Sequence, residues 1–372
     1  MQLQQYLDDF RNLKFTLAQA VDSKRWDNYV LSHPHGIAYQ LFAWKKAVEN
    51  AYGFKGIYLI AQSENRVKGV LPLIHVKLPF MRGSLVSLPY CDAGGPLADS
   101  SEIEKQLLLK ALELSVQQKI KTLTVRSISS FAGIDPELTH NANKVRMLLP
   151  LPHSADKLLA SLKAKVRSQV KKPFRDGLTV QSGGRELLDD FYPLFAENMR
   201  DLGSPVHARA WIRQILHCFA NRAVLFIVRM PDHTPAAGGI LLCHPDMVSV
   251  PWASSLRRFN RWNPNMMLYW AFLKFAADNH YPMFDFGRST PGEGTYSFKK
   301  QWGAAPSPLH WADFRTASGT GNNLLQPLPP QTAASAASAS SWKRKQAEAM
   351  IMKMPVSVSR MFGAVTRKHI SL

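Results

Sequence analysis

Residues 283–303 read MFDFGRSTPGEGTYSFKKQWG, and we take this stretch as the one around which the chain is organised. The alternating apolar residues of MFDFGR predict a strand, and YSFKKQW is interpreted as a second strand. A loop is predicted between them, because Gly292 and Gly294 allow positive φ and Pro291 fixes φ. A tight loop that presents charges of both signs on a rigid sheet suits a substrate clamp; the alternative is a hairpin with solvated charges.

The bulk composition predicts a globular protein with a polyanionic partner. The 372 residues are 46% hydrophobic and 20% charged, and length alone suggests roughly two to three domains. The formal net charge of +19 favours nucleic acid, a phosphorylated or nucleotide-linked substrate, or an anionic membrane surface. Three scattered cysteines without a CxxC pair predict neither a zinc site nor a disulfide framework. With no run of 18 apolar residues and an acidic N-terminal stretch, we expect a cytoplasmic protein.

Residues 14–150 predict a first domain of mixed α/β layers. Helices are expected across residues 23–51, followed by two strands that turn at Glu64-Asn65, a helix and further strands. The segment SLPYCDAGG breaks a strand with two glycines, which makes Tyr90 and Asp92 candidates for contact with a substrate. A metal at His33 and His35 is not expected, because no acid or cysteine stands at ligand spacing.

Residues 151–316 predict a second domain with the same order of elements. Its first helix, from about Ser154, has a buried stripe with a four-residue spacing. From Lys163 to Arg175 it carries six cations, with no acid among them until Asp176. Arg167 and Lys171 share one face of that helix, so an anion between them would relieve their repulsion; the alternative is a solvated basic face. Pro173 is expected to end or kink the helix.

Several motifs resemble the FemAB family, in particular its subgroup associated with exosortase/PEP-CTERM systems. They are HPHGIAYQLFAWKKAVENAYG, LVSLPYCDAGGPLAD, KVRSQVKKPFRDGLTV and FDFGRSTPGEGTYSFKKQWGA, and the resemblance runs from about residue 20 to 312. It implies an α/β (α+β layered) fold of two tandem GNAT-like (acyl-CoA N-acyltransferase-like) domains. It also implies transfer of an acyl or aminoacyl group onto an amine of a cell-envelope or exopolysaccharide-related substrate.

The resemblance and the expected chemistry nominate the site residues. An amine that attacks an activated carbonyl creates an oxyanion, which Lys299, supported by Arg288, would stabilise, while Asp285 or Glu293 would take the amine proton. In a strand Lys299 would point away from the aromatic residues on either side of it, whereas Lys300 would share their face. The candidates for substrate binding are Arg167, Lys171, Lys172, Tyr90, Asp92, Trp252, Asn265, Ser289, Tyr296 and Trp302.

The acyl donor stays open between aminoacyl-tRNA and an acyl-CoA, and no bound cofactor or metal is expected. A CoA site needs backbone N–H groups at the start of a helix, whereas the run from Arg288 to Gly294 has the wrong spacing for such a motif and is expected to lead into a strand. The alternatives are an acetyl-CoA-dependent N-acyltransferase and a non-catalytic basic module that binds RNA or polysaccharide. The second is disfavoured because the aromatic residues have the pattern of a core rather than of a stacking platform.

The C-terminal end is expected to be a linker and a basic tail. Residues 317–341 are rich in Ala, Ser and Pro and predict disorder. Residues 342–372 carry seven cations against Glu348 and predict an amphipathic segment. Peripheral contact with an anionic inner membrane, where lipid-linked substrates lie, is one interpretation; a disordered or self-docked tail is the other.

Overall fold

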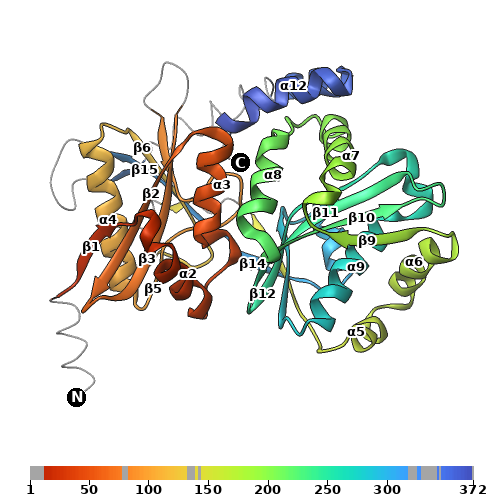
Figure 1. Cartoon of the computed structure of the whole chain (residues 1–372), viewed down its shortest axis with the longest axis horizontal. Helices are drawn as coiled ribbons and strands as arrows, with labels where there is room; N and C mark the ends of the chain where they lie inside the picture. The colour runs from red at the N-terminus through yellow and green to blue at the C-terminus, as the bar shows by residue number, and fades with distance from the viewer. Residues whose placement is uncertain are drawn as a thin grey trace. The chain divides into compact units, whose positions relative to one another are not determined.

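The chain forms two compact units, and each contains its own mixed β-sheet (Figure 1). The computed structural model describes residues 12–77, 83–131, 139–140, 144–316, 325–327, 342 and 345–370. The first unit comprises Met1–Asn143, Pro308–Pro330 and His369–Leu372, and the second comprises Lys144–Ser307 and Gln331–Lys368.

In the first unit the described strands are ordered β1-β2-β3-β4-β6-β15-β16, with β5 beside β3 and β7 beside β15. The strands are β1 (Lys14–Leu17), β2 (Lys55–Ser63), β3 (Arg66–Val76), β4 (Ser84–Val86), β5 (Leu97–Ala98), β6 (Thr122–Ser127), β7 (Thr139–His140), β15 (His310–Thr316) and β16 (Leu325–Pro327). The helices are α2 (Ser23–Ser32), α3 (Phe42–Tyr52) and α4 (Ser101–Gln117). The expected turn between β2 and β3 is confirmed, with Glu64 and Asn65 both at positive φ.

Strand β2 is buried on both faces because helices cover both sides of this sheet. Ile57 and Leu59 belong to the apolar cluster that includes α4, whereas Tyr58 packs 4.6 Å from the ring of Trp26 in α2. A strand covered on both faces loses the apolar–polar alternation of a half-exposed strand, which explains the continuous apolar run in its sequence.

In the second unit the strand order is β14-β8-β13-β12-β11-β10-β9. The strands are β8 (Val145–Pro150), β9 (Thr179–Gly183), β10 (Ala223–Arg229), β11 (Pro235–His244), β12 (Met247–Ser255), β13 (Met283–Ser289) and β14 (Ala305–Pro308). The helices are α5 (Ala155–Ser161), α6 (Ala164–Arg175), α7 (Leu188–Asp201), α8 (Arg209–Phe219), α9 (Pro264–Asp278), α10 (Gly294–Lys300) and α12 (Val356–Thr366).

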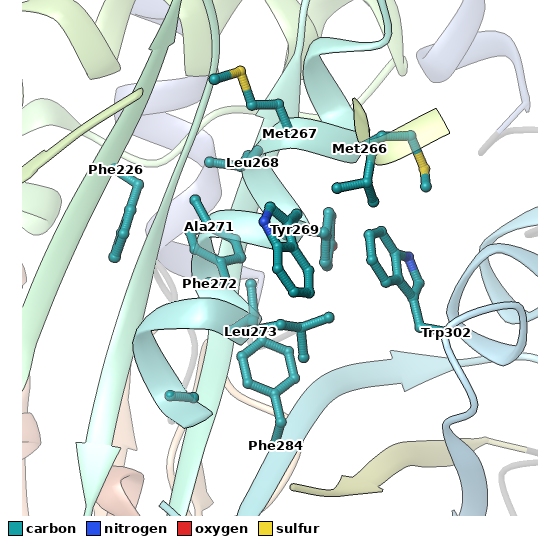
Figure 2. Packing of buried hydrophobic residues seen from close by; sticks show 14 of the residues in the cluster. Phe226, Met266, Met267, Leu268, Tyr269, Ala271, Phe272, Leu273, Phe284 and Trp302 are labelled. Carbon is teal, nitrogen blue, oxygen red and sulfur yellow. The ribbon is translucent and has the colours of Figure 1, made fainter. Parts of the chain in front are cut away.

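Two adjacent glycines in β11 let helices approach both faces of the second sheet. A Cβ on Gly238 would lie 3.2 Å from Phe191 of α7, and a Cβ on Gly239 would lie 2.7 Å from Phe272 of α9. Figure 2 shows the α9 side of this core, with the Trp302 ring turned toward the helix on the side of Met266. Close packing of α9 fixes the sheet that carries β13.

Each sheet contains one parallel strand pair at its centre, and the pairing is short. Strands β12 and β13 pair only at Val248↔Phe284 and Ser249↔Asp285, although both strands continue further. In the first unit β4 and β6 likewise pair at two positions. The carboxyl halves of β12 and β13 therefore separate, and such carboxyl ends are where open α/β sheets bind ligands.

The edges of the two units differ from the expected boundaries at residues 150 and 316. Strand β8 pairs with β13 and so belongs to the second sheet, although residues 145–150 were assigned to the first domain. Strand β15 pairs with β6 and so belongs to the first sheet, although residues 310–316 were assigned to the second domain. Pairing across such sequence distances leaves no local pattern, which is why the expected boundaries were wrong.

The C-terminal end is partly helical. Within the expected linker, Leu325–Pro327 forms β16 against β15, which corrects the prediction of disorder for these three residues; the remainder of 317–341 lies outside the described residues. Residues 345–353 are helical and are followed by α12, which packs on α7. No helix in the described part of the chain is long and apolar enough to cross a bilayer.

Candidate functional site

The stretch after β13 forms a turn and the short helix α10, so the predicted second strand is wrong. Glu293 is the N-cap residue, and its carbonyl accepts the N–H of Ser297 at 3.1 Å. Phe298 and Trp302 are four residues apart and both pack on the second core, a spacing that suits one face of a helix. The aromatic residues of YSFKKQW lie two and four positions apart. A spacing of two fits a strand and a spacing of four also fits a helix, so tertiary packing decides which of the two forms.

Asp285 is a buried counter-charge for Arg146. Its Oδ2 accepts from Arg146 Nη2 at 2.9 Å and from Arg146 Nε at 3.0 Å, and its Oδ1 accepts from the N–H of Gly287 at 2.8 Å. Gly287 has φ of 77° and sits where the register between β13 and β8 shifts. The carboxylate thus holds a bulge in β13, and taking a proton would weaken all three of these hydrogen bonds.

Lys299 lies on the inner side of α10. It is 7% exposed, and its Nζ donates to the carbonyls of Gly287 at 3.0 Å and Arg288 at 2.7 Å. Lys300 is exposed, with its Nζ 6.0 Å from the ring centroid of Tyr296. The expected difference between the two lysines exists, but it arises from a helix face and not from strand alternation.

The other polar residues of the turn lie around the hydrogen bonds that Lys299 makes to the backbone. Arg288 is half-buried, and Ser289 is 3% exposed with no hydrogen-bond partner for its Oγ among the described residues. Lys144 donates to the hydroxyl of Thr290, and Glu293 is exposed at the tip of the turn. Cations outnumber acids at this end of β13, which favours an anionic ligand.

The basic helix differs from the prediction in two ways. It is divided into α5 and α6, and α6 continues through Pro173 to Arg175, so Pro173 does not end it. The predicted stripe is buried, as expected, at Leu158, Leu162, Val166 and Val170.

The three predicted anion-binding cations have different surroundings. Arg167 donates to the carbonyls of Leu162 and Ala160 at the end of α5, and Lys172 pairs with Asp176. Lys171 is exposed and forms neither an ion pair nor a hydrogen bond with the described residues. Of the three, Lys171 is therefore the cation most available to a ligand.

The remaining predicted residues of the second unit contribute mainly to packing. The ring centroid of Trp252 in β12 lies 6.1 Å from that of Trp211 and 6.0 Å from that of His207. The pKa of His207 is well below its usual range, because the side chain is buried and because of the positive charge of Arg367. Trp302 is 1% exposed, whereas Asn265 at the start of α9 is half-buried.

Tyr90 and Asp92 belong to the first unit, where the loop after β4 turns toward β6. Arg126 is 1% exposed and donates to the carbonyls of Leu88 at 3.3 Å and Cys91 at 3.1 Å. The carbonyl of Asp92 accepts from Trp311 Nε1 at 3.1 Å. In the first unit, hydrogen bonds from Arg126 and Trp311 thus hold the loop at the end of the parallel pair β4–β6. In the second unit, by contrast, the carboxyl ends of β12 and β13 separate.

A cavity of about 60 Å³ in the first unit was not predicted. Its lining includes Glu104, whose Oε1 has no partner among the described residues and whose pKa burial raises to about 7. His33 also lines it, with Nε2 3.2 Å from the Ala98 carbonyl and Nδ1 accepting from the N–H of His35 at 3.1 Å. No group of residues that could hold a metal ion is found in the described ranges.

Arg146 and Glu104 were both missed by the sequence analysis. Arg146 left one signal, a lone cation in the apolar strand RMLLP, which indicates a buried partner. Glu104 stands among the acids of an ordinary first helical turn and left none.

Comparison with solved structures shows two tandem GNAT-like domains. Over 80% of this chain and 96% of the other, the protein superimposes on FemX with a TM-score of 0.62 and 17% identity. It also superimposes on a tandem GNAT protein from the clavulanic acid biosynthesis pathway, with a TM-score of 0.52 and 14% identity over 83% of this chain and 100% of that one. The predicted fold class is confirmed.

Sequence comparison adds two partial matches. Residues 160–300 match the family model described as an acetyltransferase (GNAT) domain. The chain is 25% identical over 193 residues to the Lipid II:glycine glycyltransferase of Staphylococcus aureus, over 47% of this chain and 45% of that protein. The match thus spans less than half the length of this relative.

Proposed function

We propose that this protein is a FemAB-type acyl- or aminoacyltransferase that acts on an amine of a cell-envelope or exopolysaccharide-related substrate. The observation that carries the proposal is the cationic carboxyl end of β13. This end lies where β12 and β13 separate, and it belongs to the segment that matches the GNAT model. The partial similarity to a glycyltransferase for lipid II supports an aminoacyl donor and an envelope acceptor. The link to exosortase/PEP-CTERM systems and a cytoplasmic site of action rest on the motif resemblance and the composition.

In this proposal the residues of the turn have separate roles. The amine nitrogen attacks the donor carbonyl and an oxyanion forms, which the positive charge at the end of β13 stabilises. The oxyanion then collapses and the bond from the carbonyl carbon to the tRNA ribose oxygen, or to the CoA sulfur, breaks; this leaving group takes up the proton that the amine has released. Lys299 acts through the carbonyls of Gly287 and Arg288, and thereby fixes the backbone from which the Arg288 side chain extends. Glu293 accepts the amine proton in this proposal; its exposure at the tip of the turn supports this role, as does the engagement of Asp285 with Arg146.

The acceptor is tested in cells and the donor is tested with purified protein. Mass spectrometry of envelope polymers from cells with and without the protein should reveal a lost acyl or aminoacyl increment. Calorimetry should show that glycyl-tRNA binds more tightly than uncharged tRNA. Identical polymers in both strains, together with equal affinity for the two tRNAs, would contradict the proposal.

An acyl-CoA donor is the second candidate, and one observation removes an argument against it. The run from Arg288 to Gly294 leads into a helix, so the expectation that it leads into a strand no longer argues against CoA. Calorimetric binding of acetyl-CoA without binding of glycyl-tRNA would select this candidate.

A further inference from the structure

Large apolar side chains are exposed mainly near the C-terminus. Of the twelve exposed large hydrophobic residues in the described part of the chain, eight lie between positions 342 and 370. They are Trp342, Met350, Met352, Val358, Met361, Phe362, Val365 and Ile370. Seven of the eight, all but Ile370, belong to the second unit. Exposed apolar side chains mark an interaction surface where they form one contiguous patch, whereas isolated ones do not.

Helix α12 is docked on the second unit through its small residues. A Cβ on Gly363 would fall 2.6 Å from the backbone N and O of Val206, and Ser359, four residues earlier, is 1% exposed. The Arg360 guanidinium lies 5.7 Å from the ring centroid of Tyr192 in α7. The helix therefore lies flush on its neighbour along the Ser359–Gly363 face.

The large residues of α12 lie on a different face. Val358, Met361, Phe362 and Val365 follow the i, i+3, i+4, i+7 spacing of one helical stripe, which we call the outer stripe. At 100° per residue its centre lies roughly 130° from the Ser359–Gly363 face. Docking thus leaves the outer stripe exposed, with Met361 74% and Val365 64% accessible.

Cations precede and follow the outer stripe in sequence. Lys345 and Lys353 are exposed before it, and Arg367 and Lys368 follow it. Arg360 is the fifth cation of this segment. The described residues 345–370 thus carry five cations and one acid, Glu348, which gives a net charge of +4. A short apolar stripe flanked by Lys and Arg has the composition of a helix that lies in the plane of an anionic lipid interface.

We propose that the outer stripe of α12 inserts into the surface of an anionic lipid bilayer, with the flanking cations at the headgroups. A second copy of the chain fits this surface less well, because it would bring two segments of net charge +4 together. An anionic bilayer instead provides apolar chains for Met361 and Phe362 and phosphates for the lysines. The inference is independent of the proposed transfer reaction.

Co-sedimentation of the full-length protein with vesicles tests the proposal. The protein should bind vesicles of phosphatidylglycerol and phosphatidylethanolamine, and bind vesicles of phosphatidylcholine much more weakly. The triple variant Met361→Gln/Phe362→Gln/Val365→Gln should lose most of the binding while retaining its thermal transition, because these residues are already exposed. The matched control is Val21→Gln, at an 86% exposed position of the first unit, and should bind as the parent does.

The charge contribution is tested separately with Lys345→Gln/Lys353→Gln. Each lysine removed should weaken binding about fivefold at low salt. Binding of the triple variant equal to that of the parent, or equal binding of the parent to both vesicle types, would overturn the proposal. So would a parent dimer in sedimentation velocity that the triple variant dissociates without any vesicle binding.

Discussion

Arg146 and Asp285 form a buried ion pair that connects β8 to β13 at the base of the polar turn. Arg146 Nη2 lies 2.9 Å from Asp285 Oδ2, and the side chains are 5% and 4% exposed. The pair joins the first strand of the second unit to the strand that carries Gly287 and Arg288, so it couples the sheet to the turn.

Removal of one partner should destabilise the protein strongly. Arg146→Met leaves a buried carboxylate without its counter-charge, and the free energy of unfolding should fall by about 3–5 kcal/mol. Urea denaturation measures this. In the double variant Arg146→Met/Asp285→Leu no charge is left buried, so most of the loss should be recovered; a double variant as unstable as the single one would show that the pair is not the cause.

Lys299 and Lys300 should differ in transfer activity. Lys299→Ala removes the ammonium that holds the carbonyls of Gly287 and Arg288, and kcat should fall about 10²-fold, the scale of one lost preorganised group. Lys300→Ala is the matched control and should keep near-normal turnover, because its side chain is exposed. The assay is a reconstituted transfer with the donor identified by calorimetry. Near-normal turnover of Lys299→Ala would contradict the assigned role.

Glu104 should make the stability of the first unit depend on pH. Burial raises its folded-state pKa to about 7, above the ordinary value of 4.5, so folding favours the protonated acid. Its contribution is complete below pH 4.5 and is lost as the pH rises through 7.

Glu104→Gln should therefore be more stable than the parent at pH 8, by about 1–2 kcal/mol after allowance for partial exposure, and nearly equal to it at pH 4.5. Thermal denaturation of both proteins across this pH range measures the difference. Glu113→Gln, at an exposed position of the same helix, serves as control, and a pH-independent difference for Glu104→Gln would exclude the titration.

Gly363→Leu should release α12 from the second unit. The new side chain would begin 2.6 Å from the backbone of Val206, which cannot retreat as a flexible side chain does. Trypsin should then cleave at Arg360 and Arg367 faster, by at least about tenfold if docking contributes 1.4 kcal/mol. Val365→Leu, on the outer stripe, should leave the cleavage rate unchanged. Equal rates for both variants would show that docking does not depend on Gly363.

Local patterns predicted much of the fold. The turn at Glu64-Asn65, the helix start at Ser154 and the buried stripe from Leu158 to Val170 were confirmed, because each depends on residues close together in sequence. The motif resemblance then led to two tandem GNAT-like domains.

The errors lie where distant residues decide. Residues 294–300 form a helix whose Phe298 packs with Trp302 on the core of α9, and α6 continues past Pro173, which is itself buried. Asp285, expected as a possible proton acceptor, is instead paired with Arg146, 139 residues away. No local stretch of sequence contains both Arg146 and Asp285, so the sequence predicted which residues line the candidate site but not how they pair.

The placement of β15 bears on how the chain is made by the ribosome. Residues 310–316 join the first sheet by pairing with β6, yet they follow residues 144–307 of the second unit in the chain. A nascent polypeptide released before residue 316 would expose the edge of β6, and such edges recruit strands from other chains. Prematurely terminated products should therefore aggregate through their first unit even though nearly all of its residues have been synthesised.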